Sequence, residues 1–383
     1  MRASGHALPV PDARTLLPDL APALDEIRAR AEASDEQGRT DPRSLDALRA
    51  SGVLALAVPR EYGGPGADGR AVNDAVRLVA EADASLAIVL FLHCAVTARL
   101  ARWGSEHQKE RYLHAIAAGD CLAASVWSEQ NAGASKARLA TTAVADGPGT
   151  WRIDGSKTFA TGAGIADVYL VLAQTSTEAG KGGYGSTAQS LFLVDAATAG
   201  VRSRPGPDLV GMRSSATGLV SFEDCRVAEG ARLGRAAQTP EIISHPHHLG
   251  YTLGAVGVGI ARAALDSALT EAADRGLLEH QAVRHALAEV EASVEAAHAL
   301  VDRAGARALQ HRGFRIALLA KAHASAVAES ACARLQRVLG SAAFVATHPV
   351  NRLARDARAI AHMGPPTHLC HEMAGAARPT SED

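Results

Sequence analysis

The sequence predicts an α+β protein in which two helical segments flank a β segment in the middle of the chain. Apolar residues recur at three- and four-residue spacing towards both ends of the 383-residue chain, which is typical of helices. Short alternating apolar runs separated by Gly, Asp and Ser fill the middle, which is typical of strands. We therefore expect a helical domain over residues 1–120, a β domain over 121–235 and a helical bundle over 236–383.

The first segment is interpreted as helices interrupted once by a turn. Helical spacing runs from PALDEIRARAEA to SEHQKERYLHAIAAG, and the sequence VPREYGGPGADG between them supplies turn residues. The most apolar run, Leu86 to Leu92, is followed by a histidine and is too short to cross a bilayer, which needs about 20 apolar residues. We expect this run to be a buried helix.

The middle segment is expected to consist of short strands joined by glycine-rich connections. One of these, TSTEAGKGGYGSTAQ, is similar to a phosphate loop only in composition, because no Gly-Lys-Ser/Thr sequence opens a helix after it. It is interpreted as a flexible hairpin. Helical periodicity returns at about residue 241 in three long stretches and a final piece that begins at Asn351.

Composition and charge exclude several classes of protein. Lys plus Arg number 39 against 41 Asp plus Glu, so there is no basic excess to attract nucleic acid. The five cysteines include no Cys-x-x-Cys pair, and the N-terminus lacks the pattern of a secretory signal. The group His245, His247 and His248 is better explained by a helix N-terminus than by a metal site. We expect a cytoplasmic protein with no metal and with neither nucleic acid nor a membrane as partner.

Five segments, in this order, resemble segments of the acyl-CoA dehydrogenase superfamily. They are WGSEHQKERYLHAIAAGD, SVWSEQNAGAS, WRIDGSKTFATGAGIADVYLVLA, GMRSSATGLVSFEDCRV and NRLARDARA. The resemblance implies an N-terminal α-helical domain, a middle β-barrel or sandwich domain and a C-terminal four-helix bundle. It also implies a flavin cofactor, FAD with FMN as the alternative, and assembly as a homodimer or homotetramer.

A flavin ring needs a flat slot with hydrogen-bond donors along one edge and no bulk on the face where substrate stacks. An isolated Ser or Thr is more often an ordinary strand residue, but here the shared register favours a role in this slot. The resemblance implies Ser125, Trp127 and Ser128 at the pyrimidine and N5 edge, Gly133 where the backbone approaches, Phe159 packed on the ring and Thr161 as a hydrogen-bond donor.

The sequence departs from the family at the catalytic base. Desaturation of an acyl thioester requires a carboxylate to take the α-proton, and the family's Glu after the Arg-Asp-Ala-Arg helix falls on Gly364. The family's other location for this base falls near Leu249 and Gly250, again without a carboxylate. Loss of a general base costs roughly 10²- to 10⁴-fold in rate. Ordinary desaturation is therefore not expected unless another group has taken over.

The sequence also departs from the family in the loops that bind the half of the cofactor far from the flavin ring. The family's Arg-x-x-Phe-Gly loop keeps only Arg275, and its Gly-Gly-x-Gly loop keeps only Gly340 within LGSAAF. The resemblance implies that these two residues contact the flavin of a neighbouring subunit. The family's Arg near coenzyme A falls on Gly250, so the sequence gives thin support for that substrate. We therefore expect this protein to bind its flavin less permanently than a housekeeping dehydrogenase does.

One branch of the superfamily fits these losses, namely the two-component monooxygenases that use reduced flavin from a partner flavin reductase. They need no α-proton base, but they must exclude water and hydrogen-bond the activated oxygen, a task suited to histidine. Around the vacated Glu position the candidates are His362 and His368, followed by His248 and His93.

Three hypotheses remain open at this point. The first is a reduced-flavin monooxygenase acting on a small-molecule substrate. The second is an acyl-CoA or carrier-bound acyl dehydrogenase whose base has moved, for example to Glu372 or a histidine. The third is a flavin-fold protein that has lost redox chemistry and serves as a binding subunit. Bleaching of bound flavin by a thioester, oxygen-dependent activity with a reductase, and failure to bind any flavin would distinguish them.

Overall fold

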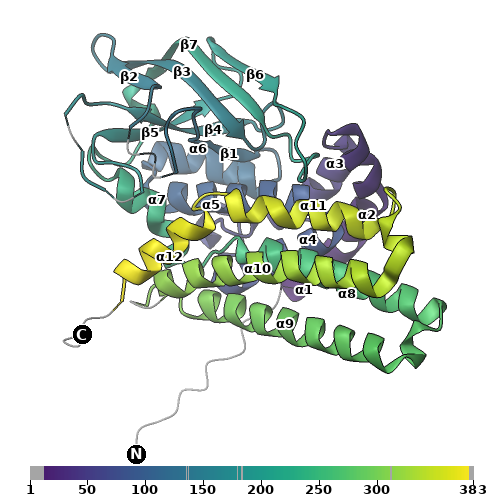
Figure 1. Cartoon of the computed structure of the whole chain (residues 1–383). Coiled ribbons are helices and arrows are strands. Elements are labelled where there is room, and N and C mark those ends of the chain that lie inside the picture. The colour runs from purple at the N-terminus through teal and green to yellow at the C-terminus, as the bar shows by residue number, and fades with distance from the viewer. Residues whose placement is uncertain are drawn as a thin grey trace, which may run out of the picture.

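The computed structural model describes residues 13–134, 136, 138–178, 180–182, 184–310 and 313–378. Figure 1 shows the strands gathered at one end of the molecule, while helices from both ends of the chain pack together at the other end. The predicted order of helices, strands and helices is confirmed.

The N-terminal helices begin at polar side chains that cap free backbone N–H groups. Asp41, Asp68 and Asp83 each accept hydrogen bonds from the first turn of the following helix. Ser105 forms a reciprocal capping box with Gln108. The helices of this part are α1 (Ala13–Leu16), α2 (Leu20–Gln37), α3 (Pro42–Ala50), α4 (Gly69–Ala82), α5 (Ala84–Trp103) and α6 (Glu106–Ala117).

Eight strands form the middle domain in the order β6-β7-β3-β2-β4-β5-β8, and β1 pairs with β4 in parallel. The strands β2 and β4 meet at one paired position, Thr142 and Gln174, so the sheet has two halves that enclose a core. The strands are β1 (Ala123–Val126), β2 (Thr142–Ala145), β3 (Thr150–Ala160), β4 (Val168–Gln174), β5 (Gln189–Asp195), β6 (Val201–Pro205), β7 (Gly218–Ala228) and β8 (Arg232–Leu233).

The strand β4 is buried on both of its faces. Val168, Leu170 and Leu172 pack with side chains of α5 and α6. The alternate residues Tyr169 and Val171 lie in the core between the two halves of the sheet. Because successive side chains of a strand point to opposite faces, one strand joins the β domain to the helices beneath it.

The C-terminal helices form a bundle in which α8, α9, α10 and α11 pack against one another. In Figure 1 the helix α11 crosses between the β domain and the rest of the bundle. The helices are α7 (Thr239–His248), α8 (Gly254–Asp274), α9 (Gln281–Ala306), α10 (Gly313–Leu339), α11 (Pro349–His362) and α12 (Thr367–Ala376).

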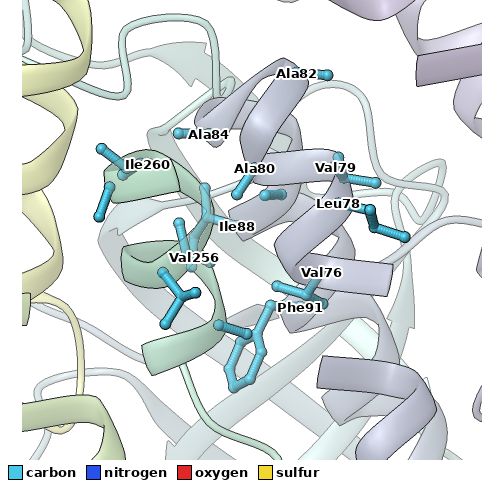
Figure 2. Packing of buried hydrophobic residues seen from close by; sticks show 14 of the residues in the cluster. Val76, Leu78, Val79, Ala80, Ala82, Ala84, Ile88, Phe91, Val256 and Ile260 are labelled. Carbon is cyan, nitrogen blue, oxygen red and sulfur yellow. The ribbon is translucent and has the colours of Figure 1, made fainter. Parts of the chain in front are cut away.

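The two helical parts share one hydrophobic core rather than two separate cores. Figure 2 shows Val256 and Ile260 of α8 beside side chains of α4 and α5. Gly259 permits this approach, because a Cβ at that position would lie 2.5 Å from the Cβ of Ala80. By length and composition α5 could cross a membrane, but 89% of its most apolar window is buried inside the protein.

Candidate active site

A cavity of about 740 Å³ lies where the β domain meets the helices. The ends of β1 and β3 and the loop 209–212 after β6 contribute to its walls. Further walls come from α5, α7, α11 and the segment 363–365 that follows α11. Segments from all three parts of the chain therefore meet at this one site.

The structure brings five of the six residues expected at the flavin ring into this cavity. Ser125, Trp127 and Ser128 follow one another at the end of β1, and Phe159 and Thr161 lie at the end of β3. The sixth, Gly133, does not line the cavity and has a left-handed backbone with φ 67°.

Phe159 is the most unusual of these residues. Its side chain is 63% exposed although it lines the cavity, and its φ of 49° lies in the left-handed region. The pairing of β3 with β7 shifts register between Lys157 and Ala160, so Phe159 lies at an irregular point of the strand. A bulky residue in this conformation is strained by about 1 to 3 kcal/mol. The strand therefore presents a flat apolar surface to the cavity at a cost in stability.

A buried ion pair fixes the turn that follows β1. The ammonium of Lys157 is fully buried and lies 2.6 Å from Oε1 of Glu129. The same carboxylate accepts hydrogen bonds from the backbone N–H groups of Ala140 and Thr141. Burial lowers the pKa of Lys157 to about 8, against the opposing effect of Glu129. The pair thus ties β3 to the turn that carries Trp127 and Ser128.

A chain of hydroxyl groups reaches the cavity at Thr161. Ser215 donates to the backbone oxygen of Met212 over 2.7 Å, so Thr217 must donate to Ser215, which is also 2.7 Å away. The proton of Thr161 is then directed to Thr217 over 2.9 Å. In this arrangement Thr161 offers lone pairs to the cavity. It becomes a donor towards a ligand if its own proton turns away from Thr217.

Two of the sequence segments noted above contact each other. The backbone N–H of Met212 donates to Asp356 of α11 over 2.6 Å, and Arg355 donates to the carbonyl of Val210 over 2.9 Å. A Cβ at Gly211 would lie 2.2 Å from the carbonyl oxygen of Arg355. Burial raises the pKa of Asp356 to about 7. The cavity wall formed by this loop is therefore clamped to the C-terminal bundle.

The position expected for the catalytic base is closed by a tyrosine. Gly364 lines the cavity, and a Cβ built there would lie 2.6 Å from the hydroxyl oxygen of Tyr184 and 3.9 Å from Nζ of Lys136. Both residues also line the cavity. Burial raises the pKa of Tyr184 to about 12, so its hydroxyl stays protonated at neutral pH.

The second location of the family's base is closed by backbone. Gly250 has a φ of 77°, and a Cβ there would lie 2.2 Å from the carbonyl oxygen of Ala304. Gly69 packs equally closely against the segment after α7, since a Cβ added at Gly69 would lie 2.1 Å from the carbonyl oxygen of Leu249. These contacts lock α4, α7 and α9 together and leave no room for a side chain at residue 250.

The predicted histidines do not gather at one point. His362 lines the cavity, whereas His368 is exposed on α12 outside the lining and His248 stacks on Phe314 with ring centroids 4.7 Å apart. Both ring nitrogens of His93 contact backbone groups inside the core. The neighbouring His247 lines the cavity instead, and burial lowers its pKa to about 4.

Arg275 and Gly340 lie together, away from the cavity. The guanidinium of Arg275 pairs with Glu271 over 2.6 Å and donates to the carbonyl of Leu339 over 3.0 Å. Neither Arg275 nor Gly340 lines the cavity of its own chain.

Sequence reasoning missed several polar residues of the lining, among them Arg99, Lys136 and Tyr184. Arg99 is buried on α5, donates to the carbonyls of Ile242 and Ile243, and lies 4.7 Å from the ring centroid of Trp127. Burial lowers its pKa to about 9. No Asp or Glu is present among the described residues of the lining. The described chain also holds no group of three or more His, Cys, Asp or Glu suited to a metal ion.

The chain matches three family models that together cover most of its length. They are described as the N-terminal domain of acyl-CoA dehydrogenase (residues 21–120), its middle domain (124–225) and its C-terminal domain (248–366). The probable acyl-CoA dehydrogenase FadE25 of Mycobacterium tuberculosis is 34% identical over 345 residues, which cover 88% of this chain and 87% of that protein.

Solved structures share the fold. Butyryl-CoA dehydrogenase from Megasphaera elsdenii superposes with a TM-score of 0.88 at 26% identity, over 97% of this chain and 99% of that one. FMN-bound TdsC from Paenibacillus sp. A11-2 superposes with a TM-score of 0.84 at 24% identity, over 94% and 96%. TdsC is a dibenzothiophene monooxygenase. Its similarity to this chain is one of fold alone.

Proposed function

The chain belongs to the acyl-CoA dehydrogenase family of oxidoreductases, and we propose that it is a flavin-dependent monooxygenase of a small metabolite. Reduced flavin, FMN or FAD, is supplied by a partner flavin reductase. The flavin provides two electrons, so that one oxygen atom of O₂ enters the substrate and the other leaves as water. The buried thiols of all five cysteines suit a reducing compartment, and we place the protein in the cytoplasm.

The residues present suit a flavin ring. Phe159 holds its ring out into the cavity at 63% exposure, an arrangement that a flat aromatic ligand would cover. Ser125, Ser128 and Thr161 add polar groups along the same wall. The turn that carries Ser128 is fixed by the pair Lys157 and Glu129. We infer that β1 and β3 bind the ring and that the clamped loop 209–212 encloses it.

One observation carries the choice of oxygenation over desaturation. The family's carboxylate is replaced by Gly364, and the space where its side chain would begin is taken by the Tyr184 hydroxyl. A phenol whose pKa is raised to about 12 is a poor proton acceptor at neutral pH. The described lining offers no carboxylate in its place. A site without a strong base suits a reaction that removes no α-proton.

The chain's own residues then have the task of excluding water and donating hydrogen bonds. Phe91, Leu253 and Met363 contribute apolar lining. Tyr184 presents a protonated hydroxyl, while His247, with a pKa of about 4, is a neutral imidazole at physiological pH. His362 is the second histidine of the lining. We assign His362 and His247 to hydrogen bonding of the activated oxygen.

A two-part experiment tests the proposal. The purified protein, loaded with FMN or FAD, is mixed anaerobically with butyryl-CoA and followed by flavin absorbance. In parallel it is supplied with a flavin reductase, NADH and O₂, and mass spectrometry detects substrates that gain one oxygen atom from ¹⁸O₂. We expect no bleaching in the first part and ¹⁸O incorporation in the second. Anaerobic bleaching by the thioester would overturn the proposal, and failure to bind any flavin would indicate a non-redox binding protein.

A second candidate function is desaturation of an acyl thioester, which the 34% identity to a probable acyl-CoA dehydrogenase favours. Glu372 is exposed and does not line the cavity, so it is a weak choice for the relocated base. His362 would then be the proton acceptor. In that case His362→Gln should abolish anaerobic bleaching, whereas Glu372→Gln should not.

We also propose that the protein is a homodimer or homotetramer. Arg275 and Gly340 lie together away from the cavity of their own chain, as residues that serve a neighbouring subunit would. Close by in sequence, Phe344 is 93% exposed and Val345 is 56% exposed, which is typical of an interface. Light scattering of Phe344→Glu, compared with the unaltered protein, should show a smaller particle if this surface is buried in the assembly.

A further inference from the structure

Two buried cations on the cavity have no anionic partner in the described part of the chain. Lys136 is 7% exposed, and its ammonium lies 5.4 Å from the ring centroid of Tyr184. Arg99 is 5% exposed and donates to neutral backbone carbonyls of α5 and α7. A buried charge without a counter-ion is costly, because desolvation is not offset by pairing. A desolvated charged group in a cleft is a candidate for a functional site, and a cation there suits an anionic ligand.

A hydrogen-bond donor completes the cluster. Tyr184 is 9% exposed, and its hydroxyl has no hydrogen-bond partner among the described residues. A phenol and an ammonium that face the same space both donate, so they suit an acceptor with several lone pairs. A carboxylate is the acceptor that best satisfies both, since charge-assisted hydrogen bonds are the stronger kind.

The location of the cluster also indicates what binds there. The Tyr184 hydroxyl and the Lys136 ammonium lie 2.6 Å and 3.9 Å from the point where a Cβ of residue 364 would stand. Because Gly364 has no side chain, nothing from residue 364 enters the space beside these donors. The Tyr184 hydroxyl fills the position of that Cβ, and it lines the cavity together with the Lys136 ammonium, so two donors border the space next to residue 364.

We infer that the substrate itself carries a carboxylate, which binds between Lys136 and Tyr184 with Arg99 nearby. This inference rests on the proposed function. The substrates of the monooxygenase would be small apolar molecules with one anionic end. The apolar remainder of such a molecule would lie against Phe91, Leu92 and Ala95 of α5, which line the same cavity. The phosphate of a flavin could also satisfy the cations, so the experiment separates the two sources.

The test measures equilibrium binding to the FMN-loaded full chain by calorimetry, without reductant or thioester. The probes are acetate, hexanoate and phenylacetate, each compared with its neutral amide. Variants are Lys136→Met and Tyr184→Phe, with Lys181→Met as a matched control. Lys181 is an exposed lysine in the connection that also carries Tyr184, outside the cavity lining. The Kd of FMN is measured for every variant.

We expect at least one carboxylate to bind about tenfold or more tightly than its amide, as a charge-assisted contact requires. Lys136→Met should remove this preference, Tyr184→Phe should reduce it, and Lys181→Met should leave it intact. If no carboxylate is preferred over its amide, the inference is wrong. It is also wrong if Lys136→Met weakens FMN binding and leaves the preference unchanged, because the anion is then the flavin phosphate. Neither result depends on oxygen transfer, so failure of the proposed function is seen separately.

Discussion

The carboxylate of Asp356 on α11 accepts a hydrogen bond of 2.6 Å from the backbone amide of Met212, in the loop that walls the cavity. Asp356 is buried, and the guanidinium of Arg352 lies 3.9 Å away. Met212 has a left-handed backbone with φ 54°, so this contact holds a strained residue in place. A segment of the C-terminal bundle thereby fixes a wall that the β domain supplies.

The pH dependence of stability should reveal this contact. Burial raises the pKa of Asp356 from 3.8 to about 7, so between these values the folded protein keeps a proton that the unfolded chain loses. The contribution of Asp356 to the free energy of unfolding therefore falls as pH rises from about 4 to about 7. Asp356→Asn can still accept from Met212 and has no charge. Urea titrations should show that the free energy of unfolding of Asp356→Asn, relative to that of the unaltered protein, rises by on the order of 4 kcal/mol between pH 4 and pH 7. A difference that does not change with pH would contradict the assignment.

Gly364 and Tyr184 should be energetically coupled. Gly364→Ala places a methyl group 2.6 Å from the Tyr184 hydroxyl and should cost about 1 to 3 kcal/mol. In the Tyr184→Ala background the same substitution should cost much less, giving a coupling energy of about 1 kcal/mol or more. Gly375→Ala is the control, because a Cβ there meets nothing within 4 Å. Additive effects in thermal unfolding would show that the two residues do not touch.

Restoring a base should restore the family's chemistry, provided that the tyrosine is removed. Gly364→Glu alone should show no thioester-dependent bleaching, because Tyr184 occupies the first atoms of the new side chain. With Tyr184→Ala added, anaerobic bleaching by butyryl-CoA should appear at roughly 10² times the background rate or more. Gly364→Gln with Tyr184→Ala has the same size without the carboxylate and should remain inactive. Equal activity of the Glu and Gln versions would exclude general-base catalysis at this position.

Phe159→Gly should have opposite effects on stability and on flavin affinity. Removing a bulky residue from a φ of 49° should stabilise the flavin-free protein by about 1 kcal/mol. Loss of the phenyl ring should weaken FMN binding by roughly tenfold or more in fluorescence titration. Ala216→Gly is the control, since it relieves a similar φ of 48° without removing a ring. Unchanged FMN affinity in Phe159→Gly would place the flavin elsewhere.

Gly250→Ala should be among the most damaging small substitutions in the protein. The new methyl group would lie 2.2 Å from a backbone carbonyl that cannot move aside, and the φ of 77° adds strain. We expect a loss of more than about 4 kcal/mol in chemical denaturation. Gly276→Ala isolates the backbone effect, because its φ is 68° and a Cβ there meets nothing within 4 Å. That substitution should cost about 1 kcal/mol. Similar losses at both positions would show that the close packing at residue 250 is unimportant.

The sequence was sufficient to predict the order of the three parts and five of the residues that the β domain supplies to the cavity wall. Ser125, Trp127 and Ser128 are consecutive or nearly so, and Phe159 and Thr161 end a single strand, so local register places each group. His93 was misleading because an apolar helix shows the same pattern whether its histidine faces a cavity or bonds to backbone. Here both ring nitrogens bond to backbone.

Lys136 and Tyr184 could not be predicted, because their significance arises from contacts across long stretches of sequence. Tyr184 lies in a glycine-rich connection without periodicity, and its closeness to Gly364 depends on how the β domain sits on the bundle. Arg99 was hidden for another reason. An arginine near the end of an apolar helix usually reaches solvent, whereas this one is buried beside the carbonyls of α7.

The core shared by α4, α5 and α8 has a consequence during translation. Residues 84–103 leave the ribosome about 170 positions before α8 ends at Asp274, and the apolar face of α5 has no partner from that helix in the interval. The nascent chain therefore carries a helix as hydrophobic as a membrane span, with a mean hydropathy of 1.8, before α7 and α8 add their part of its packing. Chaperone capture of this intermediate should accompany synthesis, and ribosome profiling with chaperone pull-down would locate it.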